Sequence, residues 1–128
     1  MSDNIQKEMN YIKEHQKEIT LIRQTLSLLH WDQETYMPKK GELSRAEQCS
    51  YLSKTLHKKV TEDKFFKAIR KLFERRKKLN FEERRMVEKL YKDISKARKI
   101  PNSFIEELSK TTSLAFSAWL ESRKKNDF

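Results

Sequence analysis

The chain has 128 residues, and its 29 Lys and Arg residues against 19 Asp and Glu residues give a formal charge of +10. The single glycine excludes a P-loop or a dinucleotide fingerprint, which need several glycines, and the single cysteine excludes an internal disulfide and a multi-cysteine zinc site. Because glycine and proline are so scarce, a turn-rich β fold is also disfavoured, and an all-α fold is expected.

The first predicted element is a long amphipathic helix over residues 3–36. Its apolar residues recur at spacings of three and four along one stripe that runs from Ile5 to Leu29. Ser2 or Asp3 is the expected N-cap, and the helix must end before Pro38, because the residue that precedes a proline is pushed out of the helical region.

Four further helices are predicted, over residues 42–59, 63–78, 81–98 and 102–125. Ser44 with Glu47, and Ser103 with Glu106, have the spacing of a capping box, although the second helix could equally begin a few residues before Ser44. Asn80 is expected to cap the fourth helix. The connections are short, so successive helices should pack in an antiparallel, bundle-like arrangement.

The apolar positions of these helices give a list of expected core residues. In the second helix the list begins at Leu43. In the fifth helix it comprises Phe104, Leu108, Ala115 and Trp119, with Phe116 as a further candidate. His15 and His57 are each isolated in charged, polar surroundings and are interpreted as surface side chains.

The positive charge is concentrated on the third and fourth helices. Between Lys64 and Lys99 there are 15 basic and 5 acidic residues, which accounts for the whole excess of +10. Such a surface can neutralise phosphates and bind nucleic acid, but a solvated outer helix face explains it more simply, so a nucleic-acid partner is not favoured. The alternative function is that of a stand-alone helical interaction module, which would bind nucleic acid or an acidic partner through the basic surface of residues 64–99. Its basic residues are Arg75, Arg76, Lys77, Lys78, Arg84 and Arg85.

The segment from His30 to Pro38 concentrates chemically versatile side chains. His30 and Glu34 are four residues apart and share a helix face, so they could hold a divalent metal, but two ligands without a third make a weak site. Trp31 and Met37 are interpreted as packing residues, and Asp32 as a hydrogen-bond anchor rather than a catalytic acid.

The same segment carries a resemblance to a known family. Residues 28–38, Leu-Leu-His-Trp-Asp-Gln-Glu-Thr-Tyr-Met-Pro, resemble the Leu-His-Trp-Asp-Gln-Glu-Thr-x-Met-Pro block of the thermostable (Taq-type) zinc metallocarboxypeptidases. Further family-like blocks follow in order at residues 45–48, 51–53, 56–57, 97–101, 118–119 and 123–128. The resemblance therefore runs from about residue 11 to the last residue.

This resemblance implies a nearly all-helical, usually homodimeric enzyme, several times longer, that releases C-terminal amino acids from peptides. In that family zinc (or cobalt) serves as the metal, held by the two histidines of His-Glu-x-x-His and a downstream glutamate. The present sequence lacks that motif. The chain is thus expected to be the N-terminal portion, inactive and cofactor-free alone, with the rest of the carboxypeptidase chain and, in the full-length enzyme, peptide substrates as partners. As such a portion, it should leave the core stripes of its first and fifth helices only partly covered and expose apolar surface.

Residues 1–128 are expected to form a single helical region that flanks the substrate cleft, and Phe128 is expected to mark a truncation. The absence of a signal-like apolar stretch or a membrane span predicts a cytoplasmic protein without a membrane partner. The candidate cleft-wall residues that match the family block are His30, Trp31, Asp32, Thr35, Met37 and Pro38.

Overall fold

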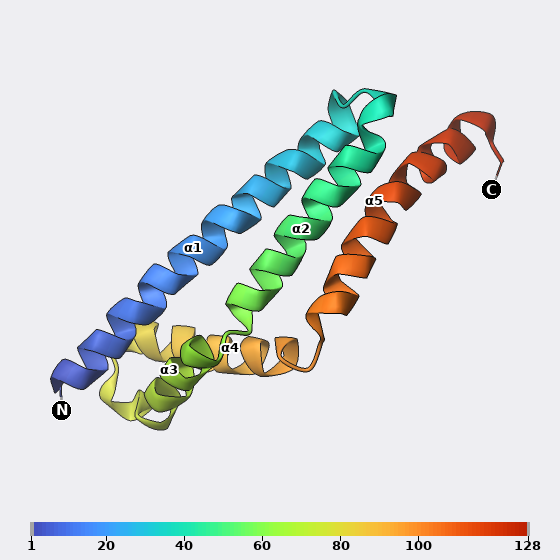
Figure 1. Cartoon of the computed structure of the whole chain (residues 1–128). Helices are drawn as coiled ribbons and strands as arrows, with labels where there is room; N and C mark the ends of the chain where they lie inside the picture. The colour runs from blue at the N-terminus through green and yellow to red at the C-terminus, as the bar shows by residue number, and fades with distance from the viewer. Residues whose placement is uncertain (1, 128) are drawn as a thin grey trace. The chain divides into compact units, whose positions relative to one another are not determined.

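The computed structural model describes residues 2–127, and the notation below follows Figure 1. Met1 and Phe128, including the expected truncation at Phe128, lie outside the described residues, as does the side chain of Ser2. Within this range the chain is helical, without a strand, so the all-α prediction is confirmed. The elements in chain order are α1 (Ser2–Thr35), η1 (Lys39–Gly41), α2 (Glu42–Val60), α3 (Asp63–Glu74), η2 (Arg76–Lys78), α4 (Phe81–Ala97) and α5 (Asn102–Lys125).

The third helix is shorter than predicted. It ends at Glu74, where Arg75 leaves the helical conformation (φ −107°, ψ 18°), and a separate 3-10 turn follows over Arg76–Lys78. The other four helices begin and end within one or two residues of the predicted bounds.

Only one of the expected side-chain caps is correct. The Asn80 side chain accepts a hydrogen bond from the Glu83 amide at 2.9 Å, as predicted. Ser44 and Ser103 lie inside α2 and α5, because those helices begin earlier, at Glu42 and at Asn102 directly after Pro101. Likewise α1 is already helical at Ser2, so Asp3 lies in its first turn, where a negative charge is favourable.

The described residues fall into two compact units, and α1 and α2 contribute to both. Unit 1 comprises the described residues of Met1–Leu21 and His57–Ile100, and unit 2 those of Ile22–Leu56 and Pro101–Phe128. The expectation of a single helical region over residues 1–128 stays a prediction.

The core of unit 1 forms between the N-terminal part of α1 and helices α3 and α4. Met9 and Ile12 from α1, Phe65 and Ile69 from α3, and Val87 from α4 are all buried, at exposures of 1% or less. Side chains of this size each contribute about 1.5–3 kcal/mol when they are removed from water. The N-terminal part of the apolar stripe predicted for the first helix is therefore one side of the core that holds unit 1 together.

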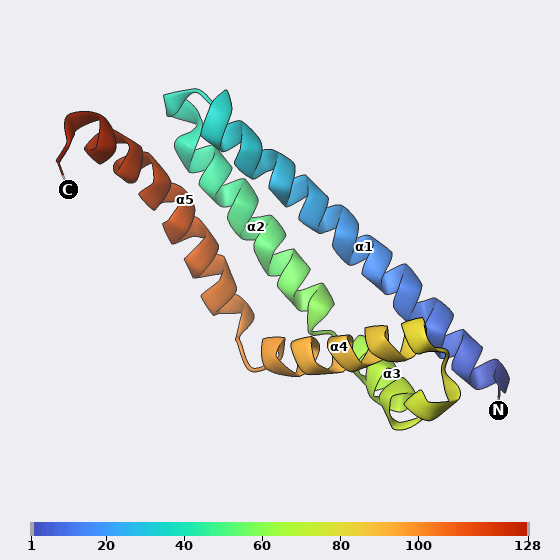
Figure 2. The ribbon, with the colours of Figure 1, turned by 180° about the vertical axis from the view of Figure 1, so that it is seen from behind.

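Unit 2 comprises the C-terminal part of α1, η1, most of α2 and α5. Within it, α2 runs antiparallel to both α1 and α5. Figures 1 and 2 show α2 alongside the other two helices. Cys49 is hydrogen-bonded to Ser113, and the Ser53 hydroxyl donates to the Ser109 hydroxyl at 3.1 Å, so α2 and α5 meet through small side chains.

Four of the five candidate core residues of α5 are exposed within this chain and Phe116 is half-buried, so the stripe is only partly covered, as expected for a portion of a longer protein. Phe104, Leu108 and Trp119 are 51%, 47% and 47% exposed, whereas the buried residue of this helix is Ser113. Ala115 is also exposed, as is Leu43 on α2. The physical reason is that α5 turns its serines toward α2, where hydrogen bonds satisfy them, and turns the half-buried Phe116 and Leu120 toward Gln33 and Met37, so that Phe104, Leu108 and Trp119 are left on the opposite face.

None of the helices in the described part of the chain combines the length and the apolar character that crossing a bilayer requires.

Candidate functional site

Arg45 on α2 anchors the C-terminal end of α1 in unit 2. Its Nη2 donates to the Asp32 carboxylate at 2.8 Å and its Nη1 donates to the Leu29 carbonyl at 2.6 Å. The Nε atom of the same guanidinium donates to the Gln48 side chain at 3.1 Å. Charge-assisted hydrogen bonds of this kind are stronger than neutral ones. The prediction that Asp32 is a hydrogen-bond anchor is therefore confirmed.

A second anchor, Gln33, was not predicted. Its side chain is buried, and its Nε2 donates to the Ser113 carbonyl of α5 at 3.1 Å. The signal that could have found it is periodicity, because Gln33 continues the apolar stripe of α1 four residues after Leu29.

The remaining members of the block divide between the interior and the surface. Met37 is half-buried, and a Cβ placed on Gly41 would lie 3.4 Å from its Cγ, so the turn is closely packed there. Trp31 is 55% exposed, and its ring centroid lies 5.5 Å from that of the exposed Tyr36. Trp31 is thus not a core residue.

Three of the candidate cleft-wall residues lie at the surface with limited contacts inside the chain. His30 and Pro38 are exposed, and Thr35 is exposed with its hydroxyl donating to the Trp31 carbonyl one turn earlier, at 2.7 Å. The structure thus brings the six candidates together at the end of α1. Asp32 and Met37 are half-buried. The other four candidates, His30, Trp31, Thr35 and Pro38, are exposed to solvent.

His30 and Glu34 line a pocket of about 260 Å³ in unit 2. Its other lining residues are Gln33, Thr112, Ser113 and Phe116, none of which is a good ligand for a transition metal. No group of three or more His, Cys, Asp or Glu side chains that could hold a metal occurs within residues 2–127. A catalytic zinc site uses three protein ligands and an open position, so these residues do not fit one.

The interpretation of His15 and His57 as surface residues is wrong, because they are only 6% and 8% exposed. The His15 Nε2 lies 2.7 Å from the Lys59 carbonyl in the last turn of α2, and its ring packs 4.1 Å from that of Phe65. The His57 Nε2 lies 2.6 Å from the Ile100 carbonyl. Each buried imidazole is thus within hydrogen-bond distance of a backbone carbonyl, that of Lys59 in the last turn of α2 or that of Ile100 after the end of α4.

Cys49 is the free thiol of the chain, and it is buried. Burial raises the pKa of the Cys49 thiol, against smaller lowering effects of Arg45 and of the hydrogen bond from Ser113. A buried thiol with a raised pKa is a poor nucleophile, so Cys49 is a packing residue rather than a catalytic one.

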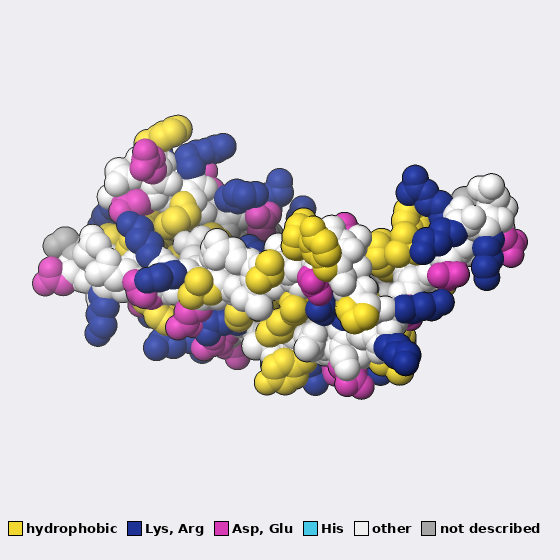
Figure 3. All heavy atoms as spheres, turned by 90° about the horizontal axis from the view of Figure 1, so that it is seen from above, with side chains coloured by type: hydrophobic (Ala, Val, Ile, Leu, Met, Phe, Trp, Pro, Cys, Tyr) yellow, Lys and Arg dark blue, Asp and Glu magenta, His cyan; other side chains and the backbone are white. Residues whose placement is uncertain are grey.

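The six basic residues of the alternative interpretation do not act as one free surface. Arg76 and Arg85 both face Glu88, with closest N–O distances of 3.9 Å and 3.6 Å. Figure 3 shows Lys and Arg side chains scattered among Asp and Glu side chains over the face in view. Arg75, Lys77, Lys78 and Arg84 are the members without an ion pair among the described residues.

Aromatic rings of α3 and α4 form a column in unit 1. Phe73 and Tyr91 stack with centroids 4.2 Å apart, and Phe66 stacks on Tyr91 at 6.0 Å. The guanidinium groups of Arg76 and Arg98 cover Phe73 and Phe66 at 4.2 Å and 4.7 Å. Each of the three rings is thus engaged by another ring, and Phe66 and Phe73 also by a guanidinium group.

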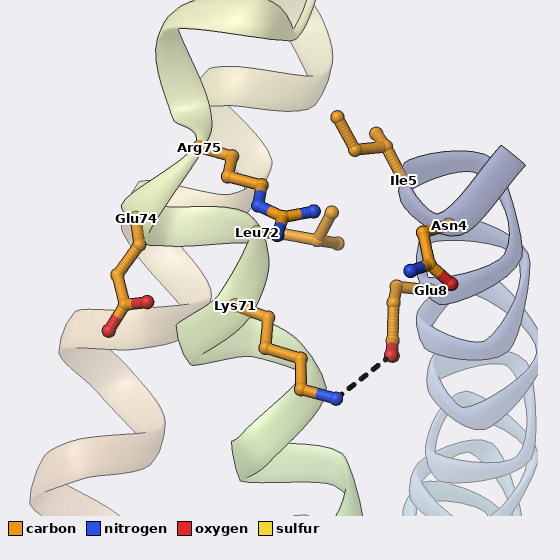
Figure 4. Close-up of a pocket in the computed structure, with 7 residues that line it drawn as sticks. All are labelled: Asn4, Ile5, Glu8, Lys71, Leu72, Glu74 and Arg75. Carbon is orange, nitrogen blue, oxygen red and sulfur yellow. Dashed lines mark hydrogen bonds and ion pairs between the residues drawn. The ribbon is translucent and has the colours of Figure 1, made fainter. Parts of the chain in front are cut away.

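A pocket of about 170 Å³ lies between α1 and α3 in unit 1 (Figure 4). Lys71 bridges it, with its Nζ 3.4 Å from the Glu8 carboxylate. Arg75 extends toward α1, whereas Glu74 points away from it (Figure 4). The acidic and basic side chains of the lining balance each other, and the lining contains no nucleophile and no imidazole.

Comparison with known families accounts for the chain as a whole. The family described as carboxypeptidase Taq (M32) metallopeptidase matches residues 11–128. The chain belongs to this M32 family. The family resemblance expected from the block at residues 28–38 is thereby confirmed, and with it the relation to metal-dependent carboxypeptidases.

Similar proteins include two thermostable carboxypeptidases 1 and a carboxypeptidase 1. The chain is 38% identical over 112 residues to the protein of Pyrococcus furiosus and 33% identical over 112 residues to that of Bacillus subtilis. It is 29% identical over 126 residues to that of Thermus thermophilus. These alignments include 88–90% of this chain but only 22–23% of each relative. The chain thus spans less than a quarter of the length of the M32 carboxypeptidases it matches.

A solved structure supports the same assignment. The crystal structure of BsuCP matches the chain with a TM-score of 0.90 at 30% sequence identity, and the match covers 95% of this chain and 24% of that one. The helices described above therefore have the M32 fold.

Proposed function

We propose that this chain supplies the N-terminal scaffold and part of the cleft wall of a zinc-dependent M32 carboxypeptidase that releases C-terminal amino acids from peptides. The observation that carries the proposal is the family match over residues 11–128 combined with the share of the relatives, 22–23%, that the chain spans.

The end of α1 is the part of the chain that we assign to the cleft wall. Arg45 and Gln33 hold this segment from the inner side by hydrogen bonds to Asp32, Leu29 and Ser113. The same bonds leave the Trp31 indole exposed on the outer side, and the His30 imidazole exposed beside Gln33, in the pocket that both residues line, so that both rings are accessible for contact with a peptide. A segment that positions a substrate needs a backbone held by hydrogen bonds to the rest of the protein and side chains that are exposed to the substrate.

Under this proposal the catalytic metal, zinc or cobalt, binds to the rest of the enzyme. The described residues do not fit a metal site, and the sequence contains no His-Glu-x-x-His. The partners are then the remainder of the carboxypeptidase chain, peptide substrates and a second copy of the full-length enzyme, in the cytoplasm.

A chimeric enzyme tests the proposal directly. The matched N-terminal part of the Bacillus subtilis carboxypeptidase 1 is replaced by this chain, and release of the C-terminal amino acid from a blocked dipeptide is measured with added zinc or cobalt. We expect the chimera to release the amino acid, and the 128-residue chain alone to give no more than a metal-only control. A folded chimera without activity, or chelator-sensitive turnover by the chain alone, would overturn the proposal.

The cleft-wall assignment is tested in the same chimera. We expect Trp31→Ala and His30→Ala to raise KM several-fold while the urea midpoint of unfolding stays unchanged. Phe81→Ala serves as the matched control, because Phe81 is a large exposed apolar residue of α4 in the other unit. Unchanged KM in both α1 variants would remove these residues from the cleft wall.

The alternative proposal is a stand-alone module that binds nucleic acid or an acidic partner through the basic residues Arg75, Arg76, Lys77, Lys78, Arg84 and Arg85. The shared partner Glu88 and the mutual stacking of the aromatic rings weigh against it. Retardation of nucleic acid that survives moderate salt would favour it, whereas loss at modest salt would indicate simple electrostatic attraction.

A further inference from the structure

Helix α5 has two faces of opposite character. The face toward α2 carries small polar residues such as Ser109 and Ser113. The opposite face carries Phe104, Leu108, Ala115 and Trp119, all exposed, which we name the outer stripe. The spacings of four and seven residues between these positions keep them on one side of the helix, over a length of about 22 Å.

The contacts of the inner face fix the direction in which the outer stripe points. The Ser113 carbonyl accepts from Gln33 of α1, the Ser53 hydroxyl of α2 donates to Ser109, and the Ser50 hydroxyl donates to the Glu106 carbonyl at 3.0 Å. Rotating α5 to bury its large apolar residues against α1 and α2 would break all three bonds. The outer stripe therefore faces away from the rest of unit 2.

The middle of α5 also lacks charge all round the helix. The ten residues 111–120, Thr-Thr-Ser-Leu-Ala-Phe-Ser-Ala-Trp-Leu, contain no Asp, Glu, Lys or Arg, in a chain in which 38% of residues are charged. A helix that lies on a protein surface normally carries charged residues on its outer face, whereas a helix without them on any side is buried. Neither face of this part of α5 has the composition of a solvent-exposed surface.

We propose that the outer stripe of α5 is the docking site of an apolar α-helix supplied by the part of the M32 fold that this chain does not span, so that α5 is an internal helix of the complete enzyme. This inference rests on the proposed function. The occupant follows from length, because 22–24% of each relative corresponds to this chain and the remainder is available to cover it. The matching helix should present apolar residues at spacings of three and four over about four turns.

Cysteine labelling tests the proposal at a single position. Ala115→Cys is introduced into the free chain and into the chimera with the Bacillus subtilis enzyme, and the labelling rate of the peptide that contains residue 115 is followed by mass spectrometry. Lys92→Cys on α4 is the matched control, because Lys92 is exposed and charged. We expect both cysteines to react at similar rates in the free chain, and residue 115 to react at least tenfold more slowly than residue 92 in the chimera.

A second measurement keeps the test independent of labelling chemistry. Trp119→Gln should lower the urea midpoint of the chimera clearly more than that of the free chain, in which the indole contacts only Phe116 and Arg123 among the ring contacts of the described residues. Equal labelling of residues 115 and 92 in the chimera would overturn the proposal. Protection of residue 115 in the free chain that grows with concentration would overturn it in favour of a second copy as the occupant. A chimera that protects residue 115 without releasing amino acids would defeat the proposed function and leave this inference standing.

Discussion

Buried polar side chains join segments of this chain that are far apart in sequence. The imidazoles of His15 and His57 reach carbonyls 44 and 43 residues away, and the Gln33 amide reaches one 80 residues away. A buried carbonyl that loses its partner costs about 1–3 kcal/mol, so each of these bonds specifies which segments pack together. The three side chains are therefore structural rather than catalytic.

His15→Ala is expected to destabilise unit 1 by about 2–3 kcal/mol, because it leaves a cavity beside Phe65 and an unpaired Lys59 carbonyl. His15→Phe keeps the ring and removes only the hydrogen bond, so its loss should be smaller, about 1 kcal/mol. Urea unfolding followed by circular dichroism measures both. His30→Ala, at an exposed position of α1, is the control and should change the free energy of unfolding by less than about 0.5 kcal/mol. Equal effects of the His15 and His30 changes would contradict the structural role of His15.

The structural roles that could be predicted from the sequence are those of residues whose partners lie within a few positions along the chain. The stripe of α1, the Asn80 cap and the end of the first helix before Pro38 all depend on neighbours within a few residues. Asp32 was correctly interpreted as an anchor, but its partner Arg45 could not be named. His15, His57 and Gln33 were missed because their partners come from distant segments, and a sequence pattern does not show which distant carbonyls are free.

At the scale of elements, α3 and α4 pair through rings as well as through aliphatic side chains. Tyr91 of α4 lies between Phe66 and Phe73 of α3, which are seven residues and thus two turns apart. Arg76 and Arg98 close the two ends of the column. Stacked pairs and guanidinium–ring contacts each add about 0.5–1 kcal/mol to the burial of the rings. The column therefore fixes the register of α3 against α4.

Removing the central ring of the column should loosen this helix pair. We expect Tyr91→Ala to lower the free energy of unfolding by about 2 kcal/mol, because a half-buried ring and two stacked contacts are lost. Tyr91→Phe keeps the ring and should stay within about 0.5 kcal/mol of the parent chain. Urea unfolding gives the free energies, and hydrogen exchange of the α4 amides shows where the loss occurs. A Tyr91→Ala chain with unchanged exchange in α4 would contradict the assigned role of the column.

Helix boundaries followed from the sequence more reliably than helix faces did. For α5 the apolar residues Phe104, Leu108 and Trp119 were assigned to the core, yet the inner face carries Ser109 and Ser113 together with the half-buried Phe116 and Leu120. Periodicity identifies an apolar stripe but not the partner that covers it. If the element that covers an apolar stripe is not part of the chain, the stripe remains exposed. The other face of the helix is then the one that packs, as the face of α5 that carries Ser109 and Ser113 does.

At the scale of the whole molecule, two exposed carboxylates pair with basic residues of unit 1, and because water screens such pairs each contributes only modestly to stability. Asp63 accepts from Arg98 at 2.8 Å, and the hydrogen bond and charge of Arg98 lower the pKa of the Asp63 carboxyl. Glu18 pairs with Lys59, and the hydrogen bond and charge of Lys59 lower the pKa of the Glu18 carboxyl. Both carboxylates join elements of unit 1, in a chain of formal charge +10.

Acid should therefore destabilise unit 1 through these two groups. A carboxyl whose pKa is lower in the folded state stabilises the fold fully above its ordinary pKa, and this contribution is lost as pH falls through the ordinary value toward the folded one. We expect the free energy of unfolding to decrease between about pH 5 and pH 2, and Asp63→Asn to remove part of that slope. The variant should be less stable than the parent at neutral pH and should approach it in acid. Urea unfolding across the pH range measures this, with Glu82→Gln as a control because Glu82 is exposed and lacks an ion pair among the described residues. A constant difference between parent and Asp63→Asn at every pH would show that the loss comes from packing rather than from the carboxylate charge.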